Sequence, residues 1–307
     1  MPERWLAPLR GVTVRAFRET YAPEIESAGF AGAYAPFIPA NPGMKFNDRL
    51  FADIRPFPAD GPAHGALRIV PQVIGKDPAA MREMLKALKD RGFTHADLNA
   101  GCPFPMIRRK GRGSGLLATP DVLDRMLEAG CREMGEGRFS LKTRLGLERP
   151  DELCALMPRI SRHPLARLVI HARTARQMYS GECDWKMAAR AAESAACPVL
   201  MNGDIPLEGH GMIGRAFIRS LGSRPDAAAR LEAYAARSRE ELSGDAPVLG
   251  RLKELVAYWR ETTPWKRLWP VLKIARSVEE FVNSARNAAG AGTSTYSMAR
   301  EWRGTRC

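Results

Sequence analysis

One cysteine of this sequence lies in a setting that suits chemistry better than packing. Cys102 follows a glycine and precedes Pro103, so its thiol is expected on a tight turn. The residues after it interleave glycines with four cations, which are Arg108, Arg109, Lys110 and Arg112. We interpret this stretch as a flexible basic loop that closes over a phosphate-bearing substrate beside the thiol. A buried, inert cysteine and a solvated run of charge are the alternative interpretations.

Other polar residues stand where short apolar runs end. They are Pro8, Gln72, Asn99, Lys142, Arg144, His171, Arg173, Asn202 and Asp204. If the runs are parallel strands of a barrel, their carboxyl ends meet at one mouth, where barrel active sites lie. Loops begin at such positions and are polar in any case, but this does not explain Lys142 directly after an apolar run. We therefore expect these residues to share one site.

Two glycine-containing segments indicate an anion site. Asn202-Gly203-Asp204 and Gly214-Arg215 combine backbone freedom with a guanidinium that can hold a phosphate through several donors. The late strands of a barrel are the usual place for a phosphate site. Lys142 would then hold a substrate or stabilise negative charge, with Schiff-base chemistry as the competing use.

The elements that position these residues alternate between strands and helices. Strands are expected at residues 5–8, 32–35, 67–73, 95–99, 139–143, 165–171 and 198–202. Asp77-Pro78 and Thr119-Pro120 predict helix starts, each with a capping side chain before a proline. The alternation favours an α/β fold, a (β/α)8 TIM-type barrel, over an open doubly wound sheet. No G-x-G-x-x-G motif follows the first strand, which also argues against a dinucleotide-binding sheet.

The connection that precedes the eighth strand is short. Residues 211–215 resemble the end of that strand, yet only residues 206–210 separate them from Ile205. A parallel crossover takes about a dozen residues or more. Either the barrel is incomplete here, or this segment is not a standard eighth strand. The predicted fold is therefore a barrel shortened between strands seven and eight.

The pattern beyond Arg219 is purely helical. One helix carries an apolar stripe made of Leu252, Leu255, Val256 and Trp259. Ser277-Val278-Glu279-Glu280 predicts a capping box that opens another helix. We expect a barrel domain at residues 1–220 and a small all-helical domain at residues 221–307, with a disordered tail from about residue 287.

Composition and charge limit the class of protein. With 307 residues, 45% of them apolar and 26% charged, the chain is typical of a globular protein and not of a disordered or collagen-like one. The net charge of +13 favours nucleic acid as a partner, although a genomic preference for arginine would give the same excess. None of the six cysteines forms a C-x-x-C pair, so we expect no metal site. No apolar run is long enough for a membrane span, and we expect a cytoplasmic protein without a membrane partner.

The order of these motifs resembles the tRNA-dihydrouridine synthase family. The matching segments are residues 6–13, 70–72, 98–103, 111–117, 141–146, 170–174, 202–205 and 212–215. They stand in the family's order, and the helical tail resembles the family's tRNA-binding domain. The resemblance implies an FMN-dependent oxidoreductase that reduces the C5=C6 bond of uridine in tRNA, with NADPH as the reductant. We expect a monomer.

The resemblance also implies roles for individual residues. Cys102 would be the general acid that protonates C5. Residues expected to bind FMN are Pro8, Gln72, Lys142, His171, Asn202, Gly203, Asp204, Gly214 and Arg215. Residues expected to contact the RNA are Asn99, Arg144, Arg173, Tyr179, Arg108, Arg109, Lys110 and Arg112. Further RNA contacts are expected on the tail, from Arg251, Lys253, Arg260, Lys266 and Arg267.

Two departures from the family pattern leave other functions open. Family members carry a full helix and strand where this chain has residues 206–210, and Ala216 replaces the usual glycine after Arg215. If Arg215 cannot reach the phosphate, FMN would bind weakly or not at all. The alternatives are a tRNA-binding protein of the same fold that has lost flavin and catalysis, or a small-molecule FMN oxidoreductase.

Overall fold

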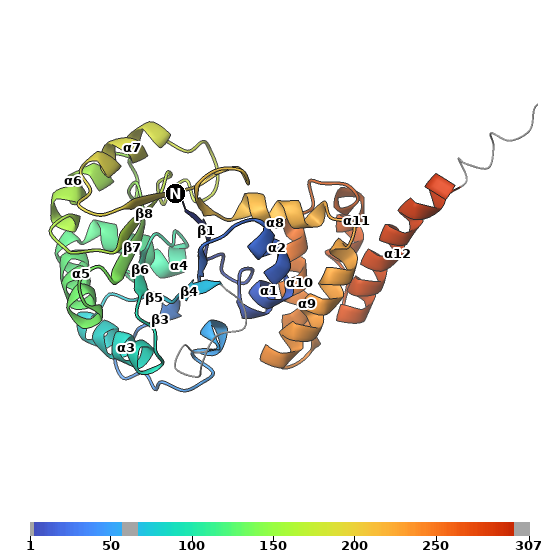
Figure 1. Ribbon diagram of the computed structural model, residues 1–307, viewed down its shortest axis with the longest axis horizontal. Helices are drawn as coiled ribbons and strands as arrows, with labels where there is room; N and C mark the ends of the chain where they lie inside the picture. Colours follow the sequence, from blue (N-terminus) through green and yellow to red (C-terminus); the bar gives the residue numbers. More distant parts are fainter. Residues whose placement is uncertain (1–2, 57–66, 298–307) are drawn as a thin grey trace, which may run out of the picture. The chain divides into compact units, whose positions relative to one another are not determined.

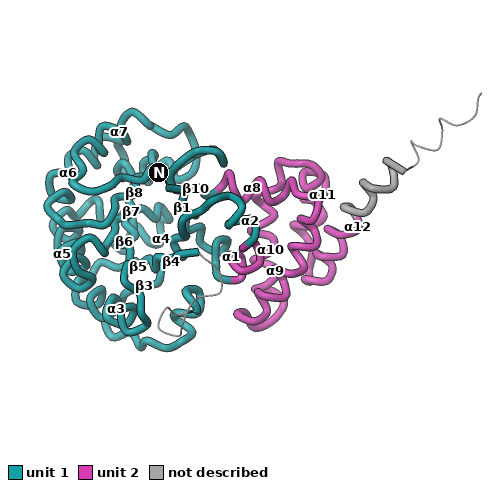
Figure 2. Tube along the Cα trace, in the orientation of Figure 1, with its two compact units in different colours: residues 1–15, 23–214 teal, residues 16–22, 215–307 magenta. Residues whose placement is uncertain are grey.

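The computed structural model describes residues 3–56 and 67–297, which belong to two compact units. The first unit comprises residues 1–15 and 23–214, and the second comprises residues 16–22 and 215–307 (Figure 2). The division expected after residue 220 falls inside helix α8 (Arg215–Gly222). The inclusion of residues 16–22 in the second unit has no counterpart in the sequence prediction.

A ring of parallel strands forms the centre of the first unit. The strands are β1 (Arg4–Leu6), β2 (Gly32–Tyr34), β3 (Ile38–Pro39), β4 (Arg68–Val70), β5 (Gln72–Ile74), β6 (Ala96–Ala100), β7 (Phe139–Arg144), β8 (Arg167–His171), β9 (Val199–Asn202) and β10 (Gly211–Ile213). Their order in the sheet is β3-β5-β6-β7-β8-β9-β10-β1-β2-β4. The strands β4 and β5 flank Pro71. The end strand β4 pairs with β2, while β5, next to the other end, pairs with β6 and β3. The sheet therefore closes on itself through this proline, which confirms the predicted α/β barrel.

Helices surround the ring (Figure 1). The long ones are α3 (Pro78–Asp90), α5 (Pro120–Met134), α6 (Glu152–Ile160) and α7 (Trp185–Glu193). Shorter helices of this unit are α2 (Ala22–Ser27), α4 (Pro105–Arg108), and the 3-10 helices η1 (Ala52–Ile54) and η3 (Gly113–Ala118). The predicted cap of α3 is confirmed, because the Asp77 carboxylate accepts a hydrogen bond of 2.8 Å from the Ala80 N–H. The predicted cap of α5 is wrong, since the Thr119 hydroxyl donates to the Leu116 carbonyl at 3.3 Å and caps no helical N–H.

The eighth strand position is filled without a preceding helix. Residues 203–210 hold turns and bends, and β10 lies between β9 and β1 as a parallel strand. Met212 is the register partner of Asn202, the last residue of β9. The strand β10 is therefore staggered so that it starts level with the end of β9, and the chain does not return along a whole strand. This stagger explains how a connection shorter than the usual dozen or so residues completes the ring.

The second unit is helical. Besides α8 it contains α1 (Arg15–Thr20), α9 (Ala227–Glu241), α10 (Asp245–Ala257), α11 (Trp265–Leu272) and α12 (Val278–Ser297). The indoles of Trp259 and Trp265 are buried and donate to the carbonyls of Ile218 and Gly222, each at 2.6 Å. These two tryptophans are therefore part of the core of this unit.

The two ends of α12 compare differently with the sequence prediction. Ser277 Oγ accepts from the Glu280 N–H at 3.1 Å, and the Glu280 carboxylate accepts from the Arg276 N–H at 2.7 Å, which is close to the predicted capping box. The helix continues to Ser297, past residue 287, where disorder was expected to begin. Residues 298–307, which belong to the same expectation, lie outside the described residues. None of the described helices is long and apolar enough to cross a membrane.

Gly130 of α5 is predicted to tolerate no side chain. A Cβ atom there would lie 2.1 Å from the ring of Phe139, which is fully buried on β7. We expect Gly130→Ala to lower the free energy of unfolding by about 1–3 kcal/mol, as overpacking does. Gly250 of α10 is the matched control, because a Cβ there would meet nothing within 4 Å. Gly250→Ala should raise the free energy of unfolding by about 0.5–1 kcal/mol. Urea unfolding measures both changes, and equal effects would contradict the packing argument.

Candidate active site

A chain of hydrogen bonds links three side chains on two neighbouring strands. Gln72 on β5 and Asp97 on β6 are register partners, and Asn99 follows two residues later on the same face of β6. Gln72 Nε2 donates to Asp97 Oδ2, and Asn99 Nδ2 donates to Gln72 Oε1, both at 2.7 Å. Asn99 Oδ1 accepts from the N–H groups of Gly101 and Cys102 at 3.1 and 2.9 Å. The chain of bonds therefore ends on the turn that carries Cys102.

Cys102 is held as a buried thiol. The residue is 7% exposed, and its carbonyl accepts from the N–H and the hydroxyl of Ser114 at 3.1 and 2.9 Å. Burial raises the pKa of the Cys102 thiol, against the lowering effects of a backbone hydrogen bond and of the charges on Arg10, Arg144 and Lys142. The thiol is therefore protonated at neutral pH, as a proton donor must be.

Lys142 joins the late strands to this site. Its Nζ donates to Asn202 Oδ1 at 2.9 Å, and Asn202 Nδ2 donates to the Met212 carbonyl at 2.7 Å. These bonds connect β7, β9 and β10. Burial and the charge of Arg144 lower the pKa of Lys142 to about 8, while the Asp97 carboxylate favours the charged form. The ammonium therefore provides a positive charge at neutral pH.

Arg144, the last residue of β7, holds two loops. It is 2% exposed, and its Nε donates to the Gly101 carbonyl at 2.8 Å. Its Nη1 donates to the carbonyls of Thr174 and Met178 at 2.9 and 2.7 Å. The guanidinium carbon lies 5.3 Å from the ring centroid of Tyr179, and burial lowers the pKa of Arg144 to about 10. Arg144 thus positions the turn at Gly101 and the loop that carries Tyr179.

The end of β8 supplies the remaining polar groups. Arg173 forms an ion pair with Asp204 and donates to the Gly181 carbonyl at 2.7 Å, and its hydrogen bond to Asp204 raises the pKa of Arg173. The His171 ring centroid lies 6.3 Å from that of Tyr179. His171 is 8% exposed, whereas Tyr179 is 38% exposed. Of these two rings, Tyr179 is therefore the one with surface to offer a substrate.

These contacts bring most of the expected site residues together. The group, called the strand-end cluster below, consists of Gln72, Asn99, Cys102, Lys142, Arg144, His171, Arg173, Tyr179, Asn202 and Asp204. It lies within the first unit, at or near the carboxyl ends of β6 to β9, whereas Gln72 begins β5 and does not end a strand as expected. The convergence of strand ends has produced a single polar site, while the roles of these residues toward a ligand stay predictions.

The segment after Cys102 is compact, so the expectation of a flexible loop was wrong. It forms α4 and η3, and residues 113–117 are buried. A Cβ at Gly115 would lie 2.4 Å from the Arg108 carbonyl, and one at Gly113 would lie 2.8 Å from the Cβ of Cys102. The glycines are required because backbone segments approach closely, and the short helices could not pack with larger residues.

The four cations of this segment have different surroundings. Arg109 and Lys110 are exposed, and Arg108 lies 3.7 Å from Glu148. Arg112 lines a hollow of about 380 Å³ beside the starts of α3 and α5. Contacts from these side chains to RNA stay predictions.

Packing alone accounts for Gly203. Its φ is +147°, and a Cβ there would lie 2.6 Å from Cys183 Sγ and 3.2 Å from the Trp185 ring. The sequence interpretation, which explained this glycine by the approach of an anion to its backbone, is therefore not the only physical reason for a glycine at this position.

The other residues expected to hold a phosphate are Pro8, Gly214 and Arg215. Gly214 packs against the residues on either side of Pro8, because a Cβ there would lie 3.1 Å from the Ala7 side chain and 3.5 Å from the Leu9 side chain. Arg215 begins α8 in the second unit.

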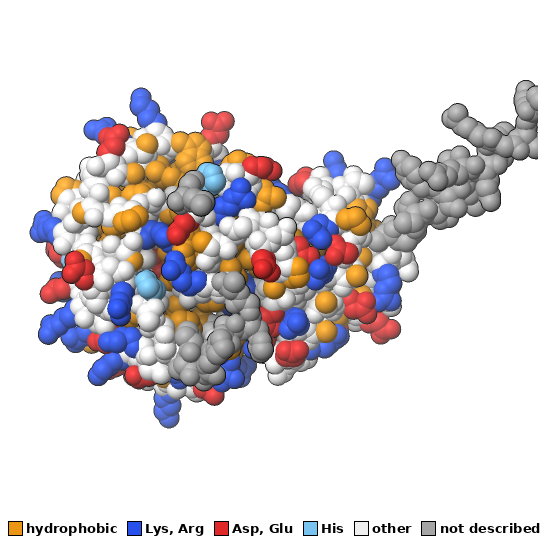
Figure 3. Space-filling model, in the orientation of Figure 1, with side chains coloured by type: hydrophobic (Ala, Val, Ile, Leu, Met, Phe, Trp, Pro, Cys, Tyr) orange, Lys and Arg blue, Asp and Glu red, His pale blue; other side chains and the backbone are white. Residues whose placement is uncertain are grey.

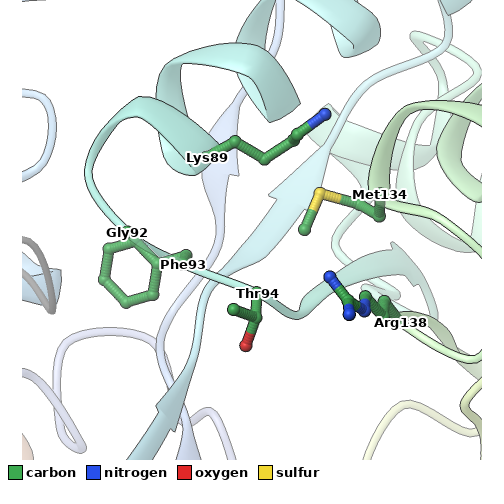
Figure 4. Close-up of a pocket in the computed structure, with 6 residues that line it drawn as sticks. All are labelled: Lys89, Gly92, Phe93, Thr94, Met134 and Arg138. Carbon is green, nitrogen blue, oxygen red and sulfur yellow. The ribbon is translucent and has the colours of Figure 1, made fainter.

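Another hollow lies at the opposite ends of the strands. It measures about 220 Å³ and is lined by Lys89, Gly92, Phe93, Thr94, Met134 and Arg138 (Figure 4). These residues lie before β6 and before β7, so the hollow is at the amino ends of the strands and apart from the strand-end cluster. In the part of the chain that the structure describes, no three His, Cys, Asp or Glu side chains are placed to hold a metal ion.

Two charged residues of the site were missed by the sequence prediction. Asp97 is fully buried, and burial raises its pKa to about 7. Arg10 adds positive charge near Cys102. The signal for Asp97 was present, because a carboxylate between Ala96 and Leu98 interrupts an apolar strand. Arg10 lies shortly after the end of β1, and the corresponding positions after other strands belong to the site.

The sequence matches a known protein family. The family model is described as dihydrouridine synthase (Dus), and the match extends over residues 5–208. It runs from β1 through β9 and ends within the short connection 203–210.

Similar proteins carry related names. The tRNA-dihydrouridine synthase B of Vibrio parahaemolyticus serotype O3:K6 is 28% identical over 205 residues, which are 65% of this chain and 59% of that protein. A probable tRNA-dihydrouridine synthase of Staphylococcus epidermidis is 34% identical over 143 residues, 45% of this chain and 43% of that protein. The chain thus spans less than two thirds of the length of these relatives. Among solved structures, the match to morphinone reductase covers 71% of this chain and 83% of that chain, with a TM-score of 0.49 and 12% identity.

The raised pKa of Cys102 predicts how its thiol reacts. Alkylating reagents attack the thiolate, and burial disfavours that form. The pH midpoint for alkylation of Cys102 by iodoacetamide should therefore be higher than the midpoint for glutathione. Timed reactions across about pH 6–11, a range that brackets the ordinary thiol pKa, followed by peptide mass spectrometry, measure this midpoint. A value at or below that of glutathione would contradict the proton-donor interpretation.

Proposed function

Because the chain belongs to the dihydrouridine synthase family, we propose that it reduces the C5=C6 bond of uridine in tRNA, using FMN and NADPH. The observation that carries the proposal is the buried thiol of Cys102 beside the positive charges of Lys142 and Arg144. Reduction of this bond needs a proton donor at C5 and positive charge where negative charge develops. The strand-end cluster has a candidate for each requirement.

Residues of the strand-end cluster fit a flavin ring. Lys142 offers an ammonium group, and Gln72 and His171 offer polar side chains from β5 and β8. A cation beside the ring suits the negative charge of a reduced flavin. When bound, the flavin would supply the hydride that adds at C6 of the uracil ring.

Cys102 would deliver the proton. Hydride addition at C6 leaves an electron pair at C5, and the Cys102 Sγ–H transfers its proton to that carbon, so that the thiol becomes a thiolate. The thiolate takes up a proton from water before the next turnover. Lys142 and Arg144 stabilise the transient negative charge, because attraction between opposite charges is strong where water is excluded.

The substrate base must leave its stack to reach the strand-end cluster. Tyr179 is partly exposed beside Arg144, so a uracil ring can stack or form hydrogen bonds there. Lysine and arginine side chains, which contact RNA phosphates in many complexes, are scattered among acidic ones over the visible surface (Figure 3). On the tail, Arg251 pairs with Glu241 at 2.7 Å and is largely buried, so the exposed Lys266 is the better candidate for such a contact.

The short connection supports a second candidate function. Residues 203–210 join β9 to β10 without a helix, and Gly203 packs against Cys183 and Trp185. A flavin phosphate needs backbone N–H groups and cations in this part of a barrel. If the phosphate cannot bind, the chain would be an RNA-binding protein of the same fold without catalysis.

The absorption spectrum of the purified protein separates these two functions. A flavin-dependent synthase should show the visible bands of an oxidised flavin, or should acquire them when FMN is added. Loss of these bands on reduction by NADPH would support the proposed reductant. A colourless protein that does not quench FMN fluorescence, yet binds tRNA with an affinity that falls as salt rises, would favour the RNA-binding alternative.

Replacement of the thiol tests the proton step. Cys102→Ala should keep the fold and the flavin bands but should lose about 10²–10⁴-fold in the rate of dihydrouridine formation, as expected for loss of a general acid. Single-turnover reduction of a tRNA transcript, with dihydrouridine quantified by mass spectrometry, measures the rate. Cys197→Ala is the control, because this half-buried thiol lies outside the strand-end cluster. A Cys102→Ala protein as active as this control would refute the mechanism.

A further inference from the structure

Asp97 is a buried carboxylate that the proposed reaction does not use. It stands between Ala96 and Leu98 in a strand whose residues are all buried, and it is itself fully buried. Gln72 donates to its Oδ2, and no donor among the described residues reaches its Oδ1. A buried carboxylate oxygen without a partner costs free energy, and an apolar side chain in such a place is often more stable. Stability therefore does not account for this residue.

The hydrogen bonds around Gln72 and Asn99 run in one direction. An ionised carboxylate only accepts hydrogen bonds, so Gln72 must turn its NH2 group to Asp97 and its oxygen to Asn99. Asn99 must then turn its NH2 group to Gln72 and its oxygen to the backbone. At the far end, the N–H groups of Gly101 and Cys102 need an acceptor, which the Asn99 oxygen provides. Both ends of the chain of bonds thus require the same orientation of both amides.

We propose that Asp97 is a positioning residue that orients Gln72 and Asn99 and, through them, the turn that carries Cys102. The proposal rests on the proposed function for its effect on turnover. With a neutral residue at position 97, only the backbone N–H groups still hold this orientation, so the amides reverse more often and the Asn99 NH2 group then faces the N–H of Cys102. These two N–H groups would face each other without an acceptor, and the turn would shift until each found another partner.

Charged neighbours favour the form of Asp97 that this role requires. Burial raises the pKa of Asp97 to about 7, while the hydrogen bond from Gln72 and the charges of Lys142 and Arg167 favour ionisation. Burial and the Asp97 charge in turn raise the pKa of Tyr34 to about 12, so this phenol stays neutral beside the carboxylate. The carboxylate is therefore the main form of Asp97 above pH 7.

Alkylation of Cys102 tests the role of Asp97 without relying on turnover. In Asp97→Asn the Cys102 thiol should react with iodoacetamide about 3-fold to 10-fold faster than in the wild type, since a turn that is no longer held opens more often. Ser140→Ala is the matched control, because Ser140 is the buried register partner of Asp97 on β7 but does not contribute to this chain of hydrogen bonds. Its alkylation rate should equal the wild-type rate. An unchanged rate in Asp97→Asn would overturn the proposal.

A double variant tests the direction of the hydrogen bonds. In Asp97→Asn combined with Gln72→Glu, the carboxylate moves to position 72, accepts from both neighbours and again turns the Asn99 oxygen to the turn. The alkylation rate should return to within about twofold of the wild-type rate, because the two sites are coupled. A rate as fast as that of the single variant would overturn the proposal. If Asp97→Asn alone does not fold by circular dichroism, the double variant decides by the same two outcomes.

Turnover separates this proposal from the proposed function. If the wild type forms dihydrouridine, Asp97→Asn should lower kcat by about 10-fold to 100-fold while the KM for tRNA changes little, as for a misplaced reacting group. A change in KM alone would overturn the positioning role. A wild type that forms no dihydrouridine contradicts the proposed function, whereas the alkylation rates still decide the role of Asp97.

Discussion

Closure of the parallel strands is the constraint on which the candidate site depends. The parallel strands place their carboxyl ends along one edge, and closure of the sheet brings these ends around a single site. The hardest place to satisfy this requirement is between β9 and β10, where Met212 pairs with Asn202 after a connection without a helix. Asn202 also accepts from Lys142 and donates to the Met212 carbonyl. The same side chain thus completes the ring and anchors the ammonium of the site.

The site concentrates buried charge at a cost in stability. The pKa values of Asp97, Lys142 and Arg144 are about 7, 8 and 10, each moved by burial toward the neutral form. Asp97 and Lys142 lower this cost for one another, because each favours the charged form of the other. Groups with such shifts gather at functional sites, where polarity is kept in spite of its cost. Burial also raises the pKa of the Cys102 thiol, which keeps it protonated.

The glycines in this protein show that a glycine can be required for different physical reasons. In sequence they suggest flexibility, and their alternation with cations suggests a loop that moves. In the structure Gly113 and Gly115 are buried where backbone segments meet, and Gly203 makes room for Cys183. A missing side chain serves motion or close packing equally well, and local sequence does not separate the two.

Local patterns were enough to predict most strand positions and the barrel, because strand and helix signals act over a few neighbours, but they missed β3 and the division of residues 67–73 at Pro71. They also singled out Cys102 and Lys142. They did not predict the stagger of β10, the commitment of Asn99 to Gln72 and the backbone, or the place of Asp97 beneath the site. These features depend on which side chains meet across strands far apart in the chain. Burial and hydrogen-bond partners are properties of that assembled environment, and only the folded chain defines them.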